Sequence, residues 1–179
     1  MSESSDAFIE SVLEGRASTV ARDLKLNLKK LLGDGHLPKE EAYLALLATA
    51  TSVQCAPLVL HSRQELTSLG LSSEMIEEAA ESAAIMAMLN IYYRFKHMVG
   101  KDEDYKTAGL RMTALGRPVL GKERFEMLAF AVSVLNGCES CIRAHENVLR
   151  EANISIDKIH DLARMVAVVK GFQTLLTIR

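Results

Sequence analysis

The sequence contains one C-x-x-C motif, formed by Cys138 and Cys141. The Asn136-Gly137 pair in front of it predicts a turn, with Cys138 at or beside the first residue of a helix. Helix positions i and i+3 share a face, so the two sulfurs can meet without backbone movement. Unpaired amides at a helix N-terminus also stabilise a thiolate. The motif therefore predicts thiol–disulfide chemistry.

Two further side chains could manage the protons of this pair. His145 follows Cys141 by four residues, and at about 100° per residue it lies on the same helical stripe as both cysteines. An imidazole over a thiol can take its proton and later return it. Glu126 lies on the preceding predicted helix and would orient His145, or act as the final base, if the two helices form a hairpin. Three other glutamates are also near in sequence and keep this assignment open: Glu123, Glu139 and Glu146.

The same residue types could also serve other chemistries. A zinc site needs four closed ligands, but the chain has no second cysteine pair and only His145 and His160 nearby, so no metal is expected. Cys55 has no cysteine near it and is predicted to be a small buried hydrophobe. The methionines recur at helical spacing, which indicates core packing rather than copper binding. The histidines other than His145 carry no specific signal: His36, His61, His97 and His160.

The composition favours helices as the elements that position these groups. The chain of 179 residues is 49% apolar, only 5% aromatic, and has 3 prolines. Such a mixture is typical of an all-α protein with a sizeable core. Apolar spacing, stop signals at Gly and start signals at Pro and Ser predict these helices: 17–32, from after Pro38 to 53, 58–69, 73–93, 122–135, 138–152, and 155 to the C-terminus.

The helical pattern repeats along the chain. The segment from His61 to Ala80 resembles the segment from His145 to Ala163, at an offset of 83 to 84 residues. We therefore expect a helical bundle of two similar multi-helix halves within one domain, residues 1–179. Residues 1–99 form the half without a cysteine pair, 100–121 a Gly-rich and charged surface connector with a short helical turn, and 122–179 the half with the C-x-x-C motif.

Charge and hydropathy exclude several classes of protein. The net charge of −2 leaves no basic footprint, so no nucleic-acid partner is expected. Residues 1–6 are polar and acidic, unlike a signal peptide, and the longest apolar runs, 42–53 and 128–135, are too short to span a membrane. The expected location is cytoplasmic. In that reducing compartment a close cysteine pair is more often catalytic or metal-binding than a structural staple.

The letters around the motif resemble a known family. The series FE, FAVS, NGCESC and AHE over residues 125–146 resembles the signature of the alkyl hydroperoxide reductase D (AhpD) proteins, within the carboxymuconolactone decarboxylase-like superfamily. Glu126 stands twelve residues before the cysteine pair and His145 four residues after it, which makes the match more specific than C-x-x-C alone. The likeness extends to residues 22–28, 90–94 and 109–112.

The resemblance implies an all-helical homotrimer, or a multiple of one, with no bound cofactor. It also implies alkyl hydroperoxidase activity and a role as thiol reductant of the peroxiredoxin AhpC. Lipoyl groups on a dihydrolipoamide acyltransferase would be the electron donor. By the same resemblance Cys141 is the peroxidatic thiol, Cys138 resolves its sulfenic acid, and Glu126 and His145 form the proton relay. Some members have a histidine where this chain has Ser140, whose hydroxyl is no base near neutral pH.

Two other functions stay open from the sequence. One is decarboxylation of a lactone, as the superfamily name implies, which needs no pair of thiols. The other is a helical scaffold without catalysis that presents a partner-binding surface.

Overall fold

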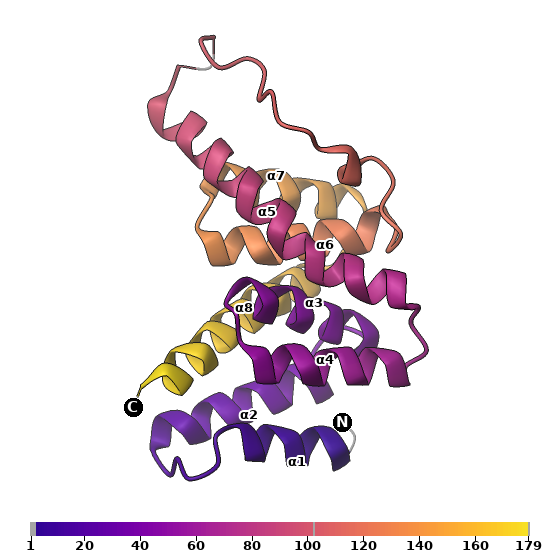
Figure 1. The fold of residues 1–179 in the computed structure, drawn as a ribbon, viewed down its shortest axis with the longest axis vertical. Coiled ribbons are helices and arrows are strands. Elements are labelled where there is room, and N and C mark those ends of the chain that lie inside the picture. The colour runs from indigo at the N-terminus through magenta and orange to yellow at the C-terminus, as the bar shows by residue number, and fades with distance from the viewer. Residues whose placement is uncertain (1–2, 102, 179) are drawn as a thin grey trace.

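The computed structural model of the chain describes residues 3–101 and 103–178 and confirms the all-α prediction (Figure 1). Met1 and Ser2 of the polar opening, and Asp102 of the connector, lie outside the described residues. Within them the helices are α1 (Glu3–Val12), α2 (Thr19–Gly33), α3 (Lys39–Ser52), α4 (Ala56–Ser68), α5 (Ser73–Val99), η1 (Thr113–Leu115), α6 (Lys122–Asn136), α7 (Glu139–Glu151) and α8 (Ile156–Thr177). No helix among them is both long and apolar enough to cross a membrane.

Two helices form the centre of the bundle. Residues 42–50 of α3 and 127–133 of α6 are buried without interruption. A helix that is apolar all round is stable only when other elements cover every face. Here α3 packs against α4, α5, α6 and α8, while α6 also packs against α5, α7 and α8. Short connections join α3 to α4 and α6 to α7, so each of these pairs forms a helical hairpin (Figure 1).

The helices of the two halves recur in one register. The starts of α3, α4 and α5 are followed 83 residues later by the starts of α6, α7 and α8. Ser72 and Ser155 cap the third helix of each half in the same way, by accepting a hydrogen bond from the backbone three residues ahead. This register aligns Ser62, rather than His61, with His145. The expected alignment of the two histidines was therefore wrong by one residue.

Helix α1 was not predicted. Its sequence opens with Ser and Glu residues, yet Ile9 and Leu13 at i and i+4 are completely or almost completely buried. Helix α5 also continues six residues past the predicted end at Tyr93 and stops at Gly100, whose φ of 64° is a left-handed cap. Val20, an apolar residue of α2, is 60% exposed. The sequence pattern thus missed one helix and ended another too early.

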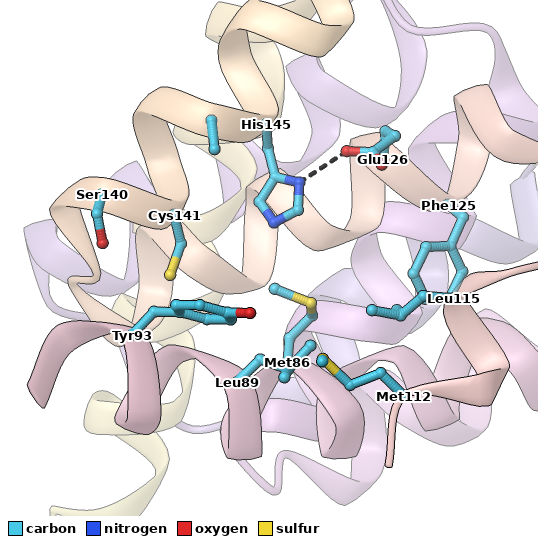
Figure 2. Close-up of a pocket in the computed structure, with 11 residues that line it drawn as sticks. Met86, Leu89, Tyr93, Met112, Leu115, Phe125, Glu126, Ser140, Cys141 and His145 are labelled. Carbon is cyan, nitrogen blue, oxygen red and sulfur yellow. Dashed lines mark hydrogen bonds and ion pairs between the residues drawn. The ribbon is translucent and has the colours of Figure 1, made fainter. Parts of the chain in front are cut away.

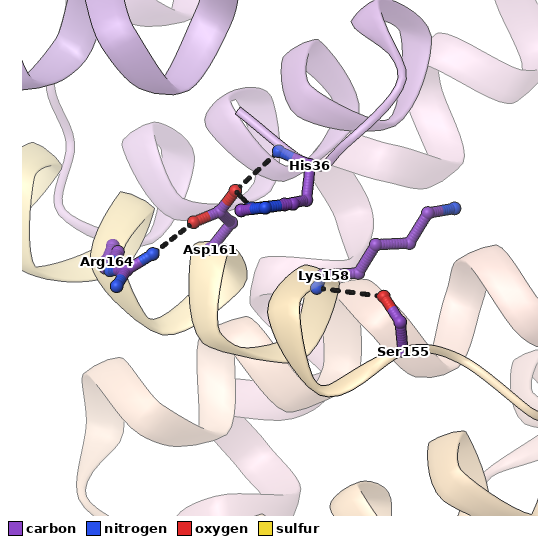
Figure 3. Close-up of polar contacts among 5 residues, drawn as sticks. All are labelled: His36, Ser155, Lys158, Asp161 and Arg164. Carbon is purple, nitrogen blue, oxygen red and sulfur yellow. Dashed lines mark hydrogen bonds and ion pairs between the residues drawn. The ribbon is translucent and has the colours of Figure 1, made fainter. Parts of the chain in front are cut away.

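A buried carboxylate joins the N-terminal half to α8 (Figure 3). Asp161 Oδ2 accepts a hydrogen bond from the His36 backbone N at 2.7 Å and lies 3.0 Å from His36 Nδ1, while Arg164 donates to Oδ1 at 2.8 Å. Burial alone would raise the pKa of Asp161, but these hydrogen bonds hold its pKa below the usual value. The loop after α2 is thereby fixed against α8.

The connector crosses the outside of the bundle between α5 and α6 (Figure 1). It contains the short turn η1, as expected for this segment. At its end the backbone N–H groups of Val119 and Leu120 donate to the two carboxylate oxygens of Glu78 on α5, at 2.8 and 2.7 Å. This contact anchors the connector before α6 begins.

Candidate active site

The cysteine pair stands at the start of α7. Cys138 is the N-cap residue and Cys141 lies in the first turn, with a Cα–Cα distance of 5.3 Å and a disulfide between the two sulfurs. The turn in front follows from Gly137, whose φ of 64° few other residues adopt. The Cys138 N–H donates back to the Ser133 carbonyl at 3.2 Å. Cys138 is therefore beside the first residue of the helix, as predicted, and the two sulfurs meet as their spacing indicated.

A cavity of about 280 Å³ opens beside the pair. Most of its wall is apolar and comes from α5, the connector and α6: Met86, Leu89, Tyr93, Met112, Leu115 and Phe125. Figure 2 shows the Cys141 sulfur pointing into this space near Tyr93. Cys138 does not line the cavity and is fully buried, whereas Cys141 is 6% exposed. The two sulfurs thus differ in access, and the cavity reaches only Cys141.

His145 and Glu126 form the polar end of the cavity. His145 Nδ1 lies 2.7 Å from Glu126 Oε2, and about a fifth of each side chain is exposed. The contact arises because α6 and α7 form a hairpin (Figure 2). An ionised carboxylate accepts a hydrogen bond from the Nδ1–H group, and in this tautomer Nε2 carries no proton and faces the cavity. The pair can therefore move a proton at Nε2.

The structure also decides between the four candidate glutamates. Glu139 pairs with Arg143 and Glu146 with Arg150, each along the exposed side of α7. Glu123 is exposed at the start of α6. Among these glutamates, only Glu126 lines the cavity.

Comparison with known proteins agrees with the motif. The alkyl hydroperoxide reductase AhpD of Anaeromyxobacter dehalogenans (strain 2CP-C) is 42% identical over 154 residues, which cover 83% of this chain and 80% of the relative. The chain belongs to the AhpD family. The AhpD proteins of Streptomyces coelicolor and Mycolicibacterium smegmatis are each 39% identical, over 89% and 88% of this chain and 89% of each relative. The carboxymuconolactone decarboxylase family model matches residues 105–178.

In this AhpD-family chain Ser140 lies where the resemblance placed a histidine in some members. Its Oγ is 3.6 Å from the Cys138 sulfur and it lines the cavity. A hydroxyl at this position can hydrogen-bond a sulfur but cannot accept a proton as a base near neutral pH. His145 and Glu126 remain as a hydrogen-bonded acid–base pair that lines the cavity.

Two residues on α5 hydrogen-bond the end of α6 just before the cysteine pair, and they were not singled out from the sequence. Asn90 is completely buried, donates to Ser133 Oγ at 2.9 Å and accepts from Asn136 Nδ2 at 3.0 Å. Arg94 donates to the Asn136 carbonyl at 2.7 Å. The only sequence signal for them was their place in the family-like segment 90–94.

The remaining candidate residues have structural surroundings. Cys55 is buried and free, as predicted for a small hydrophobe. Met86 is buried and also lines the cavity, so core packing describes it only in part. Across residues 3–101 and 103–178, no three His, Cys, Asp or Glu side chains come together as metal ligands. In the described part of the chain, the C-x-x-C motif therefore has no further side chains beside it that would complete a zinc site.

Proposed function

We propose that this protein is an antioxidant thiol–disulfide oxidoreductase that reduces alkyl hydroperoxides with the Cys138–Cys141 pair. One observation carries the proposal: the sulfur of Cys141 faces an apolar cavity whose polar end is a histidine held by a carboxylate. The names of the AhpD relatives support the same class of reaction.

In the reduced enzyme, His145 Nε2 takes the proton of the Cys141 thiol, and Glu126 stabilises the imidazolium. The thiolate attacks the outer oxygen of the hydroperoxide, the O–O bond breaks, and the leaving alkoxide takes the proton to become an alcohol. Cys141 is then a sulfenic acid. The Cys138 thiol attacks that sulfur, the S–O bond breaks, and water leaves as the disulfide forms.

The cavity wall favours organic hydroperoxides over hydrogen peroxide. The free energy of binding becomes more favourable when an alkyl group displaces water from these apolar side chains, whereas hydrogen peroxide offers no apolar surface. We expect an alkyl or aryl hydroperoxide to have the larger kcat/KM, with most of the difference in KM.

Electrons return to the pair by thiol–disulfide exchange. The dithiol of a dihydrolipoyl group attacks the protein disulfide, leaves two protein thiols and becomes a cyclic disulfide. We propose lipoyl groups on a dihydrolipoamide acyltransferase as this donor and the peroxiredoxin AhpC as a further acceptor of the electrons. We also propose a cytoplasmic location and a homotrimer or a multiple of it, which sedimentation equilibrium would test directly.

The proposal is tested by steady-state consumption of cumene hydroperoxide with dihydrolipoamide as donor. Cys141→Ser is expected to abolish turnover while circular dichroism remains that of a native helical protein, and Cys138→Ser should leave at most a single turnover. Cys55→Ser, at a buried cysteine outside the site, should retain full activity. Full activity in Cys141→Ser, or indifference of the wild type to thiol-blocking reagents, would overturn the proposal.

A further inference from the structure

The turn in front of the cysteine pair is held from α5 by a buried polar network. Asn90 and Arg94 lie one helical turn apart, on one face of α5. Asn90 contacts both the Ser133 hydroxyl and the Asn136 amide, and Arg94 contacts the Asn136 carbonyl. These contacts cover the last turn of α6, which leads directly into Gly137 and Cys138.

The network reaches the redox pair through the backbone. Ser133, whose hydroxyl accepts from Asn90, uses its carbonyl to accept from the Cys138 N–H. Asn136 is bound at its side chain and at its carbonyl, and is separated from Cys138 by one residue. A displacement of this turn would therefore move the Cys138 sulfur relative to Cys141.

The first half of the chain provides an internal control. Its turn at Gln54 has the same left-handed backbone, with φ of 57°, and Cys55 N–H donates to the Ala50 carbonyl at 2.9 Å. Cys55 is likewise the N-cap of α4. The fold thus forms this turn and this cap in a half without a cysteine pair.

At the equivalent turn before Cys55, the residues that correspond to the network are different. At the register of 83, Ser133 and Asn136 correspond to Ala50 and Val53, whose side chains cannot hydrogen-bond. Asn90 and Arg94 correspond to Gln173 and Thr177 on α8. The polar network therefore lies at the turn before the disulfide, and the equivalent turn before Cys55 forms without it. Fold formation does not explain why a fully buried amide is present at residue 90.

We propose that Asn90 and Arg94 are positioning residues for the redox reaction: they hold the turn 133–138 so that the sulfurs stay within bonding reach after reduction. This inference rests on the proposed function. In the oxidised protein the S–S bond itself constrains the turn, whereas after reduction that constraint is gone and the network takes its place. Preorganisation of the dithiol raises the effective concentration of one thiol toward the other and so favours disulfide closure.

The test is the thiol–disulfide equilibrium of the pair with glutathione. Protein oxidation releases two electrons and two protons, which glutathione disulfide takes up as its S–S bond breaks to give two thiols. Acid quenching followed by thiol alkylation measures the fraction oxidised. Arg94→Met and Asn90→Leu are each expected to lower the equilibrium constant for disulfide formation by about tenfold, the effect of losing one charge-assisted or buried hydrogen bond.

Gln173→Leu, at the counterpart of Asn90 in the other half, is the matched control and should leave the constant unchanged. Because Arg94 is half-buried, Arg94→Met keeps the test decisive if Asn90→Leu fails to fold. Constants within about twofold of the wild type in folded Arg94→Met, even with a lower Tm, would overturn the positioning role. The two proposals fail separately, since a wild type that equilibrates with glutathione but consumes no hydroperoxide would contradict the proposed function alone.

Discussion

At the scale of single residues, the proposed chemistry depends on the contact between Glu126 and His145. A carboxylate that accepts from Nδ1 fixes both the tautomer and the orientation of the ring. Cys141 lies on the same helix as His145, four residues earlier, and both line the cavity. In the proposed mechanism Glu126 acts through His145, to which it is hydrogen-bonded.

We predict that Glu126→Gln lowers the rate of hydroperoxide reduction by about ten- to a hundredfold, because the neutral amide no longer stabilises the imidazolium. Stopped-flow measurement of thiol oxidation over a range of pH would give both the rate and the titration of the base. Glu123→Gln, at an exposed residue of the same helix, is the control and should react like the wild type. An unchanged rate in Glu126→Gln would remove the carboxylate from the mechanism.

His61 is a second histidine with an unusual environment. It is 4% exposed, its ring stacks on Phe8 of α1 with centroids 3.9 Å apart, and it meets the edge of Tyr43 at 5.8 Å. Its Nε2 is buried and has no hydrogen-bond partner in the described residues. Burial lowers the pKa of His61, Glu65 opposes that shift and Lys39 adds to it. The folded protein thus keeps this imidazole neutral.

The lowered pKa of His61 makes the folded protein less stable as the pH is lowered. Below about pH 6.5 the unfolded chain binds a proton at His61 that the folded chain binds only at lower pH, so the free energy of unfolding falls as the solution is acidified. We predict that His61→Phe, which keeps the stacking, makes stability less dependent on pH between about pH 7.5 and 5. Urea unfolding of both proteins measures this. Parallel pH dependences would contradict the assignment, and exposed His160→Phe is the control.

At the scale of elements, the two halves share a backbone but differ in the side chains placed on it. The α3–α4 hairpin puts Cys55 at the position of Cys138, and Leu58 at the position of Cys141. Tyr43 stands at the position of Glu126, and Ser62 at that of His145. The first half therefore has the scaffold of the site and one of its sulfurs.

We predict that Leu58→Cys creates a second disulfide, between Cys55 and the introduced thiol, because the equivalent residues of α7 already meet at a Cα–Cα distance of 5.3 Å. Loss of the buried leucine should destabilise the reduced variant by about 2 to 3 kcal/mol. Thiol titration of the denatured, oxidised variant is expected to find no free cysteine. Leu60→Cys, at a 62% exposed residue of the same helix, should leave both its thiol and Cys55 free. A free Cys55 in Leu58→Cys would show that the two turns differ.

The helices that the sequence predicted well have local start or stop signals. Ser72 and Ser155 cap their helices as the pattern indicated, and Gly137 ends α6. Helix α1 was missed because its few apolar residues that reach the core, Phe8, Ile9 and Val12, stand among polar and charged residues. The C-terminal turns of α5 were missed because exposed apolar side chains there, such as Phe95 and Met98, break the expected amphipathic pattern.

At the scale of the whole molecule, the site combines local and distant parts of the chain. Cys138, Cys141 and His145 could be placed together from the sequence because they lie on or beside one helix, where spacing fixes direction. Glu126, on the preceding helix, remained one of four candidate glutamates. The apolar wall from α5 and the connector could not be predicted, since nothing in the spacing of residues 86–115 says which hairpin they cover. The same holds for Asn90 and Arg94, whose partners are 42 to 46 residues away.

The central claim is that an organic hydroperoxide oxidises this one pair of cysteines to an intramolecular disulfide. It is tested most directly by a single turnover: fully reduced protein is mixed with substoichiometric cumene hydroperoxide, quenched in acid and alkylated, and the cysteines are identified by peptide mass spectrometry. The account predicts one Cys138–Cys141 disulfide for each hydroperoxide converted to alcohol, with Cys55 still a thiol. Conversion of hydroperoxide while both thiols remain alkylated, or no conversion at all, would contradict it.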